Sequence, residues 1–336
     1  MTRTVRALSM FSGGLDSLLA TRVIKDLGVE VVALHFTAPF IRPISRGASE
    51  RGVEYWRRVL GVTVREIKMG PEFIDVIRAP MYGHGKNLNP CVDCKIFMLR
   101  KAATIMETER FDFVVTGEVL GQRPMSQRRD TLAAIEKHST LRGRLLRPLC
   151  AKLLAPTIPE EEGLIDREKL FDFSGRSRAP QLALAAALGI ADPPGSAGGC
   201  LLTDKNYAKR LARLLSIQTE ITDAGFELLT IGRHFDLDGH GTLVVSRNEN
   251  ENHLLERFRG AATFFLEPQD WPGPVALILH SENPAHVTLA ARFMARYGKI
   301  KPGKTVSVQP IVAGEPFAIG AEPIDEETIL RLRINS

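Results

Sequence analysis

SMFSGGLDS, residues 9–17, joins a short apolar run to a helical pattern near the start of the chain. A turn between a strand and a helix exposes backbone N–H groups, and its two glycines let an anion approach them closely. An ordinary tight turn is the alternative, because glycine and serine are common in such turns. The segment has no Walker A lysine, so a different phosphate site is expected. We predict that phosphates contact Ser12, Gly13, Gly14 and Ser17, and that Asp16 binds Mg²⁺.

The residues around this turn alternate apolar runs with helical patterns, as in βαβ units. Strands are expected at residues 5–11, 29–36, 62–69, 111–119 and 144–149, and helices at 15–27, 49–60, 95–107 and 128–138. This order predicts an α/β fold with a doubly wound parallel sheet of five strands. Such sheets bind ligands at the carboxyl ends of their strands, where the SGGLDS turn lies.

The regular alternation of strand and helix patterns ends after the fifth expected strand. Helical patterns follow at residues 167–171, 179–188 and 206–215. Short β-like runs come next, at 227–235, 242–246, 263–267 and 275–280, with one helical pattern at 284–297. We therefore predict two domains that divide near Ile217: a catalytic domain of residues 1–217 and a smaller α+β domain of residues 218–336.

The formal net charge of +5 is distributed unevenly over the 336 residues. Residues 1–217 carry 33 basic and 23 acidic side chains, and the remainder carries 11 and 16. A basic domain suits a polyanion such as RNA, although many unrelated enzymes have a similar surplus. No apolar stretch approaches the roughly 18 residues that a membrane span needs. We expect a cytoplasmic protein without membrane contact, whose oligomeric state the sequence does not specify.

Three of the four cysteines suggest a metal or redox site. Cys91 and Cys94 form a CxxC motif, and Cys200 follows a glycine-rich turn. The cysteines are too few and too unevenly spaced for a disulfide framework, so we expect reduced thiols. A CxxC motif is compatible with a redox pair, a zinc half-site or an iron–sulfur half-site. Zinc prefers four ligands and would need Cys150, which we expect in the core.

Two motifs resemble known families. SGGLDS is similar to the PP-loop of the N-type ATP pyrophosphatases, which cleave ATP to AMP and pyrophosphate and adenylate a carbonyl oxygen of the substrate. VVTGEVLGQRPMSQ at residues 114–127 and LLRPL at residues 145–149 resemble segments of tRNA 4-thiouridine synthetases. This resemblance adds Gly117, Glu118 and Gln122 to the expected ATP site. A polar loop after a strand is the alternative.

The CxxC motif with one distant cysteine resembles the pattern of iron–sulfur-dependent tRNA thiolases. The resemblance implies that Cys91, Cys94 and Cys200 hold a [4Fe–4S] cluster beside the PP-loop, with one open iron that can bind sulfide. The implied enzyme is an ATP- and Mg²⁺-dependent tRNA sulfurtransferase. It adenylates a uridine carbonyl oxygen and replaces it with sulfur, which we expect to give 4-thiouridine. Asp16 and the three cysteines are its expected catalytic residues, and sulfide or an external donor supplies the sulfur.

The C-terminal part resembles the RNA-binding domain of NFACT proteins. Its basic stretch predicts RNA contacts at Arg292, Arg296, Lys299, Lys301 and Lys304, and a solvated helix end is the alternative. Too few residues precede SGGLDS for the THUMP domain of 4-thiouridine synthetases, so we expect this part to help hold the tRNA. Two other functions stay open: a PP-loop ligase or amidating enzyme for a small metabolite with structural zinc, and a nucleotide-sensing RNA-binding protein.

Overall fold

The computed structural model describes residues 3–41, 53–190, 192–195, 199–298, 300, 303–311 and 314–334. Contacts divide the chain into two compact units, Met1–Thr203 and Asp204–Ser336. The division precedes the boundary predicted near Ile217, because helix α9 (Lys205–Ile217) packs with the second unit. Arg210 on this helix donates to the carbonyl of Leu229 at 2.7 Å. An amphipathic pattern reveals that a helix is half-buried but not which core it covers.

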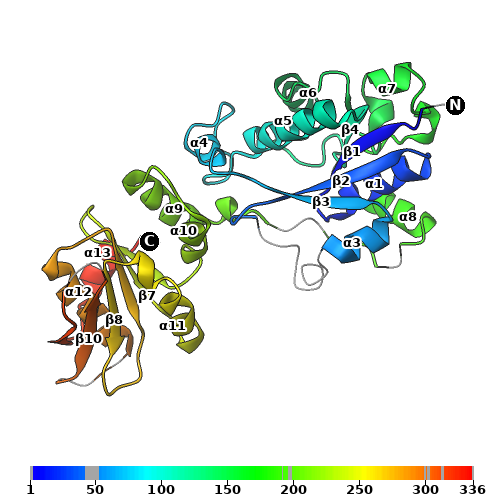
Figure 1. Cartoon of the computed structure of the whole chain (residues 1–336). Coiled ribbons are helices and arrows are strands. Elements are labelled where there is room, and N and C mark those ends of the chain that lie inside the picture. Colours follow the sequence, from blue (N-terminus) through cyan, green and yellow to red (C-terminus); the bar gives the residue numbers. More distant parts are fainter. Residues whose placement is uncertain are drawn as a thin grey trace. The chain divides into compact units, whose positions relative to one another are not determined.

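As predicted, the first unit contains a parallel five-stranded sheet (Figure 1). The order of its strands is β3-β2-β1-β4-β5. Its strands are β1 (Arg6–Met10), β2 (Glu30–Thr37), β3 (Thr63–Lys68), β4 (Phe113–Thr116) and β5 (Leu145–Leu146). Its α-helices are α1 (Leu15–Asp26), α3 (Val53–Leu60), α4 (Phe73–Arg78), α5 (Cys91–Glu109), α6 (Arg129–His138), α7 (Ile158–Glu161) and α8 (Ala179–Ala187). Short 3₁₀ helices are η1 (Ala151–Leu153), η2 (Arg167–Lys169) and η3 (Leu201–Thr203).

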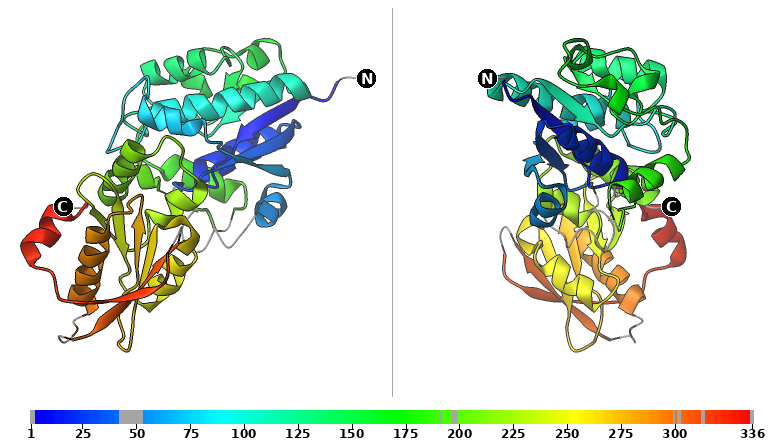
Figure 2. Two further views of the ribbon diagram at one scale, coloured as in Figure 1. Left: turned by 60° about the vertical axis from the view of Figure 1, so that its left-hand side comes forward. Right: turned by 90° about the vertical axis from the view of Figure 1, so that its right-hand side faces the viewer.

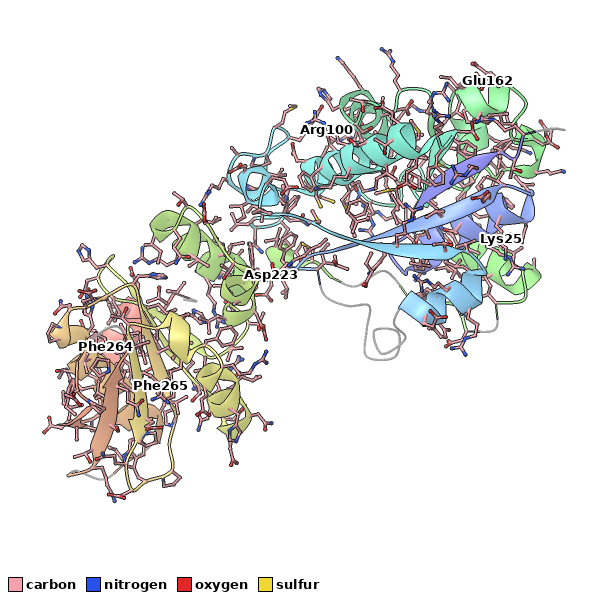
Figure 3. The ribbon with its side chains drawn as sticks, viewed as in Figure 1. Lys25, Arg100, Glu162, Asp223, Phe264 and Phe265 are labelled. Carbon is pink, nitrogen blue, oxygen red and sulfur yellow. The ribbon has the colours of Figure 1, made fainter. Side chains whose placement is uncertain are left out.

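The central strand β1 shows why the sheet is covered on both sides. Ala7 and Leu8 are adjacent, so they point to opposite faces of the sheet, and both are fully buried. Helices α3 and α8 contact α1, and α4 and α6 contact α5, which gives the two helical layers visible in Figure 2. Lys25, labelled in Figure 3, donates to the carbonyl of Leu60 at 2.9 Å and joins the ends of α1 and α3.

The order of the strands fixes where a ligand can bind. The chain moves outward from β1 to β2 and β3, and then returns to place β4 on the other side of β1. The crossover connections therefore leave β1 and β4 in opposite directions, and doubly wound sheets have their ligand crevice at the carboxyl ends of two such strands. The SGGLDS turn follows β1. Residues 116–118, which we call the TGE segment, begin at the last residue of β4, so both predicted nucleotide segments lie at this crevice.

The first unit also contains details that the sequence pattern does not predict. Helix α4 was not expected, because its six residues are too few to show a helical period. The pattern at residues 167–171 forms only the 3₁₀ helix η2. Strand β5 pairs over just two residues, although six were expected. Residues 49–52 of one predicted helix lie outside the described residues, and the remainder forms α3.

The second unit contains an antiparallel sheet in the order β11-β10-β8-β9-β7-β6. Its strands are β6 (Arg233–Asp236), β7 (Thr242–Val245), β8 (Phe264–Pro268), β9 (Ala276–Leu279), β10 (Thr305–Pro310) and β11 (Phe317–Gly320). Its helices are α9, α10 (Asp223–Leu228), α11 (Glu249–Glu256), the 3₁₀ helix η4 (Arg259–Ala261), α12 (Pro284–Gly298) and α13 (Glu326–Leu332). This arrangement confirms the predicted second α+β fold.

Two packed cores cover the faces of this second sheet. Phe264 and Phe265, labelled in Figure 3, belong to different core clusters, as expected for neighbours in a strand. The strand predicted at residues 227–235 is partly wrong, because α10 occupies its beginning and β6 starts only at Arg233. The Thr222 hydroxyl accepts from the backbone N–H of Gly225 and caps α10, which explains the helix. Across the described ranges, no helix is both long and apolar enough to span a membrane.

Candidate active site

The SGGLDS turn forms a loop whose own side chains fix its shape. Gly13 has φ of 75°, in the left-handed region that favours glycine. The Ser17 hydroxyl accepts from the backbone N–H of Ser12 at 3.2 Å and donates to the carbonyl of Gly14 at 2.9 Å. Among the residues that the structure describes, no side chain caps the first turn of α1, so the positive end of the helix faces the loop. Ser17 thus shapes the loop, and its contact with phosphate stays a prediction.

Asp16 lies at the beginning of α1, and only one of its two carboxylate oxygens has a hydrogen-bond partner among the described residues. Its Oδ2 accepts from Gln122 Nε2 at 3.2 Å. Its Oδ1 is buried and has no hydrogen-bond partner among the described residues, and the same holds for Gln122 Oε1. Buried acceptors without partners are costly, and a bound cation would satisfy them. The donor set therefore fits the predicted Mg²⁺ position.

Ser126 and Gln127, both in the segment that resembles 4-thiouridine synthetases, contribute two further unpaired atoms. Ser126 Oγ and Gln127 Oε1 are buried without a hydrogen-bond partner in the described part of the chain. The segment is closed by a bond from the Gly121 N–H to the Gln127 carbonyl at 2.8 Å. Buried polar atoms are usually paired with protein, water or a ligand, and the burial of these two residues is evident only in the folded chain.

Gly117 brings the two predicted nucleotide segments together. A Cβ atom at Gly117 would lie only 2.5 Å from the backbone C and O of Asp16 and from the backbone N of Ser17. The end of β4 and the start of α1 therefore meet through their backbones. Only glycine allows this approach without movement, which explains the residue type.

Glu118 forms the centre of a buried cluster of charges. Lys95 forms an ion pair with Glu118, and Arg147 Nε donates to Glu118 Oε2 at 3.0 Å. Arg147 also bonds Glu136 at 3.0 Å, which connects α6 to the cluster. Burial by itself raises the pKa of Glu118, but the Lys95 and Arg147 charges together lower it to about 2. The carboxylate is therefore ionised and fully engaged, so Glu118 positions its neighbours, and a direct contact with ATP stays a prediction.

Lys95 links this cluster to the thiols, because it directly follows Cys94 on α5. The link was missed in the sequence, although Lys95 adjoins the CxxC motif and Arg147 lies in LLRPL. Neither position reveals that the two cations share one carboxylate. The path from the PP-loop to the thiols thus runs through two adjacent residues, Gly117 and Glu118.

Cys200 reaches this region from a distant part of the chain. It forms an isolated antiparallel bridge with Ile41, in the segment that follows β2. The N–H of Leu88 donates to the Leu202 carbonyl at 3.2 Å, and Asn87 Nδ2 donates to the Thr203 carbonyl at 2.8 Å. The segment that carries Cys200 is therefore bonded to the loop that leads into Cys91.

The three thiols lie within electrostatic reach of one another. Burial raises the pKa of Cys94, and the neighbouring Cys200 and Cys91 raise it further. Burial and Cys91 raise the pKa of Cys200 to about 11. Cys150 is fully buried, and its Sγ lies 3.3 Å from the Glu118 carbonyl oxygen, as expected for a core thiol. In the parts of the chain that the structure describes, no three His, Cys, Asp or Glu side chains are grouped to hold a single metal ion.

The predicted RNA contacts of the second unit are only partly available. Arg296 Nη2 donates to Glu326 Oε2 at 2.8 Å, and Lys304 Nζ donates to the Asp270 carbonyl at 3.0 Å. Arg292 is half-buried on α12, one turn before Arg296. The remaining two predicted contacts, Lys299 and Lys301, lie outside the described residues.

The fold and this site define a class: an α/β unit with a doubly wound parallel sheet, a glycine-rich loop after β1 and three cysteine thiols near the same edge of the sheet. The comparisons with known proteins are more specific. Residues 3–152 match the family described as thiamine biosynthesis protein (ThiI), and residues 232–332 match the NFACT protein RNA binding domain. These matches confirm the resemblance of the first part to the 4-thiouridine synthetase family and that of the C-terminal part to the NFACT RNA-binding domain.

Individual proteins show the same similarity. The probable tRNA sulfurtransferase of Finegoldia magna is 32% identical over 151 residues, which are 44% of this chain and 36% of that protein. The match thus spans about a third of the relative's length. A 4-thiouridine synthetase–RNA complex with bound ATP matches 55% of this chain and 52% of its own, with 18% identity and a TM-score of 0.35. The U34-tRNA thiolase NcsA of Methanococcus maripaludis, with its [4Fe–4S] cluster, matches 61% and 64%, with 14% identity and a TM-score of 0.32.

Proposed function

We propose that this protein is a tRNA sulfurtransferase that forms 4-thiouridine with ATP. The observation that carries the proposal is the double contact of the TGE segment. Gly117 abuts the PP-loop backbone, and the adjacent Glu118 holds Lys95 beside Cys94. Activation by a nucleotide and delivery of sulfur would therefore take place in one crevice. The match of residues 3–152 to the ThiI family and the similarity to a probable tRNA sulfurtransferase support this assignment.

The first half-reaction would be the adenylation of uridine. The triphosphate would bind at Gly13, Gly14 and the N-terminal end of α1, where backbone N–H groups and the helix dipole favour an anion. The O4 atom of uracil attacks the α-phosphorus, a P–O bond forms, and pyrophosphate leaves with the electrons of the bond to the β-phosphate. A carbonyl oxygen leaves poorly by itself, whereas adenylated oxygen leaves as AMP. Asp16, whose Oδ1 is unpaired, would hold Mg²⁺ beside the phosphates.

The second half-reaction would replace the activated oxygen with sulfur. Cys91, Cys94 and Cys200 would hold a [4Fe–4S] cluster, which when bound supplies the site that presents the incoming sulfur. One zinc ion requires all its sulfur ligands within about 2.3 Å of a single point, whereas a cluster binds each cysteine to a different iron. Lys95, fixed by Glu118, would orient the start of α5 toward the nucleotide.

The second unit would hold part of the tRNA, and sulfide or an external donor would supply the sulfur in the cytoplasm. The match of residues 232–332 to an RNA-binding domain supports this role. Arg292 and Lys304, together with Arg296, Lys299 and Lys301, remain the proposed contacts.

The test is reconstitution with tRNA. Protein purified without oxygen should be brown, release pyrophosphate from ATP when tRNA is added, and produce 4-thiouridine detected by mass spectrometry of the digested RNA. A colourless protein that contains zinc and transfers no sulfur would contradict the proposal. ATP binding without any pyrophosphate release would instead indicate a nucleotide sensor.

A further inference from the structure

The first unit contains a cavity that none of the predicted site residues explains. Its volume is about 470 Å³, and it lies between α6 and residues 151–160, beside the edge strand β5. Its walls are largely apolar and include Leu132, Leu145 and Leu154. Three exposed cationic side chains also line it: Arg129 and Lys137 on α6, and Arg142 in the turn that follows. A fourth, Arg147, is buried and bonded to Glu118 and Glu136.

This cavity adjoins the nucleotide segment. A second, shallower hollow is lined by Leu120 and Gly121 of that segment and by the first residues of α6. The two hollows share Arg129 and Ala133, so they adjoin each other along α6 and are treated together as one groove. We call this groove the α6 groove. It begins at Gly121 of the candidate active site and ends near Lys137.

The three exposed cations of the α6 groove, Arg129, Lys137 and Arg142, are not neutralised by nearby acids. Residues 122–144 contain six basic and two acidic side chains. Asp130 pairs with Arg128 at 3.3 Å, and Glu136 pairs with the buried Arg147 at 3.0 Å. The other lining carboxylate, Glu160, forms an ion pair with Arg167 at 2.5 Å. Arg129, Lys137 and Arg142, by contrast, form no ion pair with any residue that the structure describes.

The α6 helix presents these cations in a fixed arrangement. Arg129, Ala133 and Lys137 are four residues apart, so they share one face, and the small Ala133 leaves the groove open between the two charges. Arg100 on α5, labelled in Figure 3, donates to the carbonyl of His138 at 2.7 Å and fastens the end of α6. The two cations are therefore about 12 Å apart along the helix, a spacing greater than one phosphate group spans.

We infer that the α6 groove binds the backbone of the RNA substrate next to the nucleoside that is modified. The inference rests on the proposed function and deepens it, because it assigns an RNA contact to the first unit. A row of unpaired cations over an apolar floor suits a strand whose phosphates follow the rim and whose bases lie on the floor. A mononucleotide would engage only one end of the row.

The test compares two double variants of the full chain, each of which removes two positive charges. Arg129→Gln/Arg142→Gln alters the α6 groove. The control, Arg58→Gln/Arg110→Gln, alters two exposed arginines that form no ion pair with any described residue, on α3 and at the end of α5. Helix α3 packs beside β3, at the sheet edge opposite β5. Affinity for fluorescently labelled tRNA is measured by anisotropy at several salt concentrations, together with ATP binding and Tm.

The groove variant should bind tRNA about 10-fold more weakly at low salt, and the slope of log Kd against log salt should fall by about 1.5, because two phosphate contacts are lost. ATP binding and Tm should match the wild type, and the control should bind tRNA normally. Unchanged tRNA affinity and slope in the groove variant would overturn the inference. So would a loss of ATP or AMP binding with normal tRNA binding, which indicates a free nucleotide. If the wild type itself does not bind tRNA, the proposed function fails.

Discussion

Replacing Gly117 by alanine should separate the nucleotide segments while adding only one methyl group. The new Cβ would lie 2.5 Å from three backbone atoms of Asp16 and Ser17, whereas ordinary contact begins at 3.4 Å. Because backbone cannot rotate away as a side chain can, the end of β4 and the start of α1 must move apart by about 1 Å, at a cost of about 1–3 kcal/mol. A shift of about 1 Å between reacting groups lowers a rate by about 100-fold.

The assay for Gly117→Ala is pyrophosphate release with saturating tRNA, together with ATP affinity by calorimetry and Tm. The matched control is Gly260→Ala in the second unit, since a Cβ there meets nothing within 4 Å. Turnover should fall by about 100-fold in the first variant and stay normal in the second. Turnover of Gly117→Ala within twofold of wild type, with unchanged ATP affinity, would show that the close approach does not position the site.

Four further variants test the rest of the site. Glu118→Gln leaves two buried cations without their carboxylate and should reduce the free energy of unfolding by about 3–5 kcal/mol in urea at pH 7. Because the Glu118 pKa is lowered from 4.5 to about 2, its stabilisation is complete above pH 4.5 and lost as the pH falls toward 2, and the variant should lack this loss. Cys91→Ala should abolish the brown colour of anaerobic protein, and Cys150→Ala should retain it. Asp16→Asn should keep the wild-type Tm but lose Mg²⁺-dependent pyrophosphate release; persistence of that release would contradict the metal role.

Much of the first unit is predictable because its signals are local. The alternation of apolar runs and helical patterns around SGGLDS identifies the five strands, and the switch in strand order then places the crevice. Short elements are less predictable, since the six residues of α4 cannot establish a period. The sequence does not predict α10, because its apolar run also resembles a strand. The cap that Thr222 provides is evident only from its hydrogen bond in the structure.

The same distinction holds for the candidate site: neighbouring residues specify some of its parts, and contacts between distant segments specify the others. Motifs identify Asp16 and the CxxC pair, because their chemistry is contained in a few neighbouring letters. The ion cluster of Lys95, Glu118 and Arg147 joins three separate segments, so no single stretch of sequence specifies it. The unpaired atoms of Ser126 and Gln127 depend on burial, which only the folded chain defines.

The adjacency of Gly117 and Glu118 has a consequence for how such an enzyme can change. One residue abuts the loop that would hold the triphosphate, and the next anchors the helix that carries two of the thiols. A backbone shift of these two residues would therefore change the rates of both proposed half-reactions. Substitutions near the PP-loop should therefore occur together with compensating substitutions near the thiols. The two parts of the proposed site should then change together during evolution.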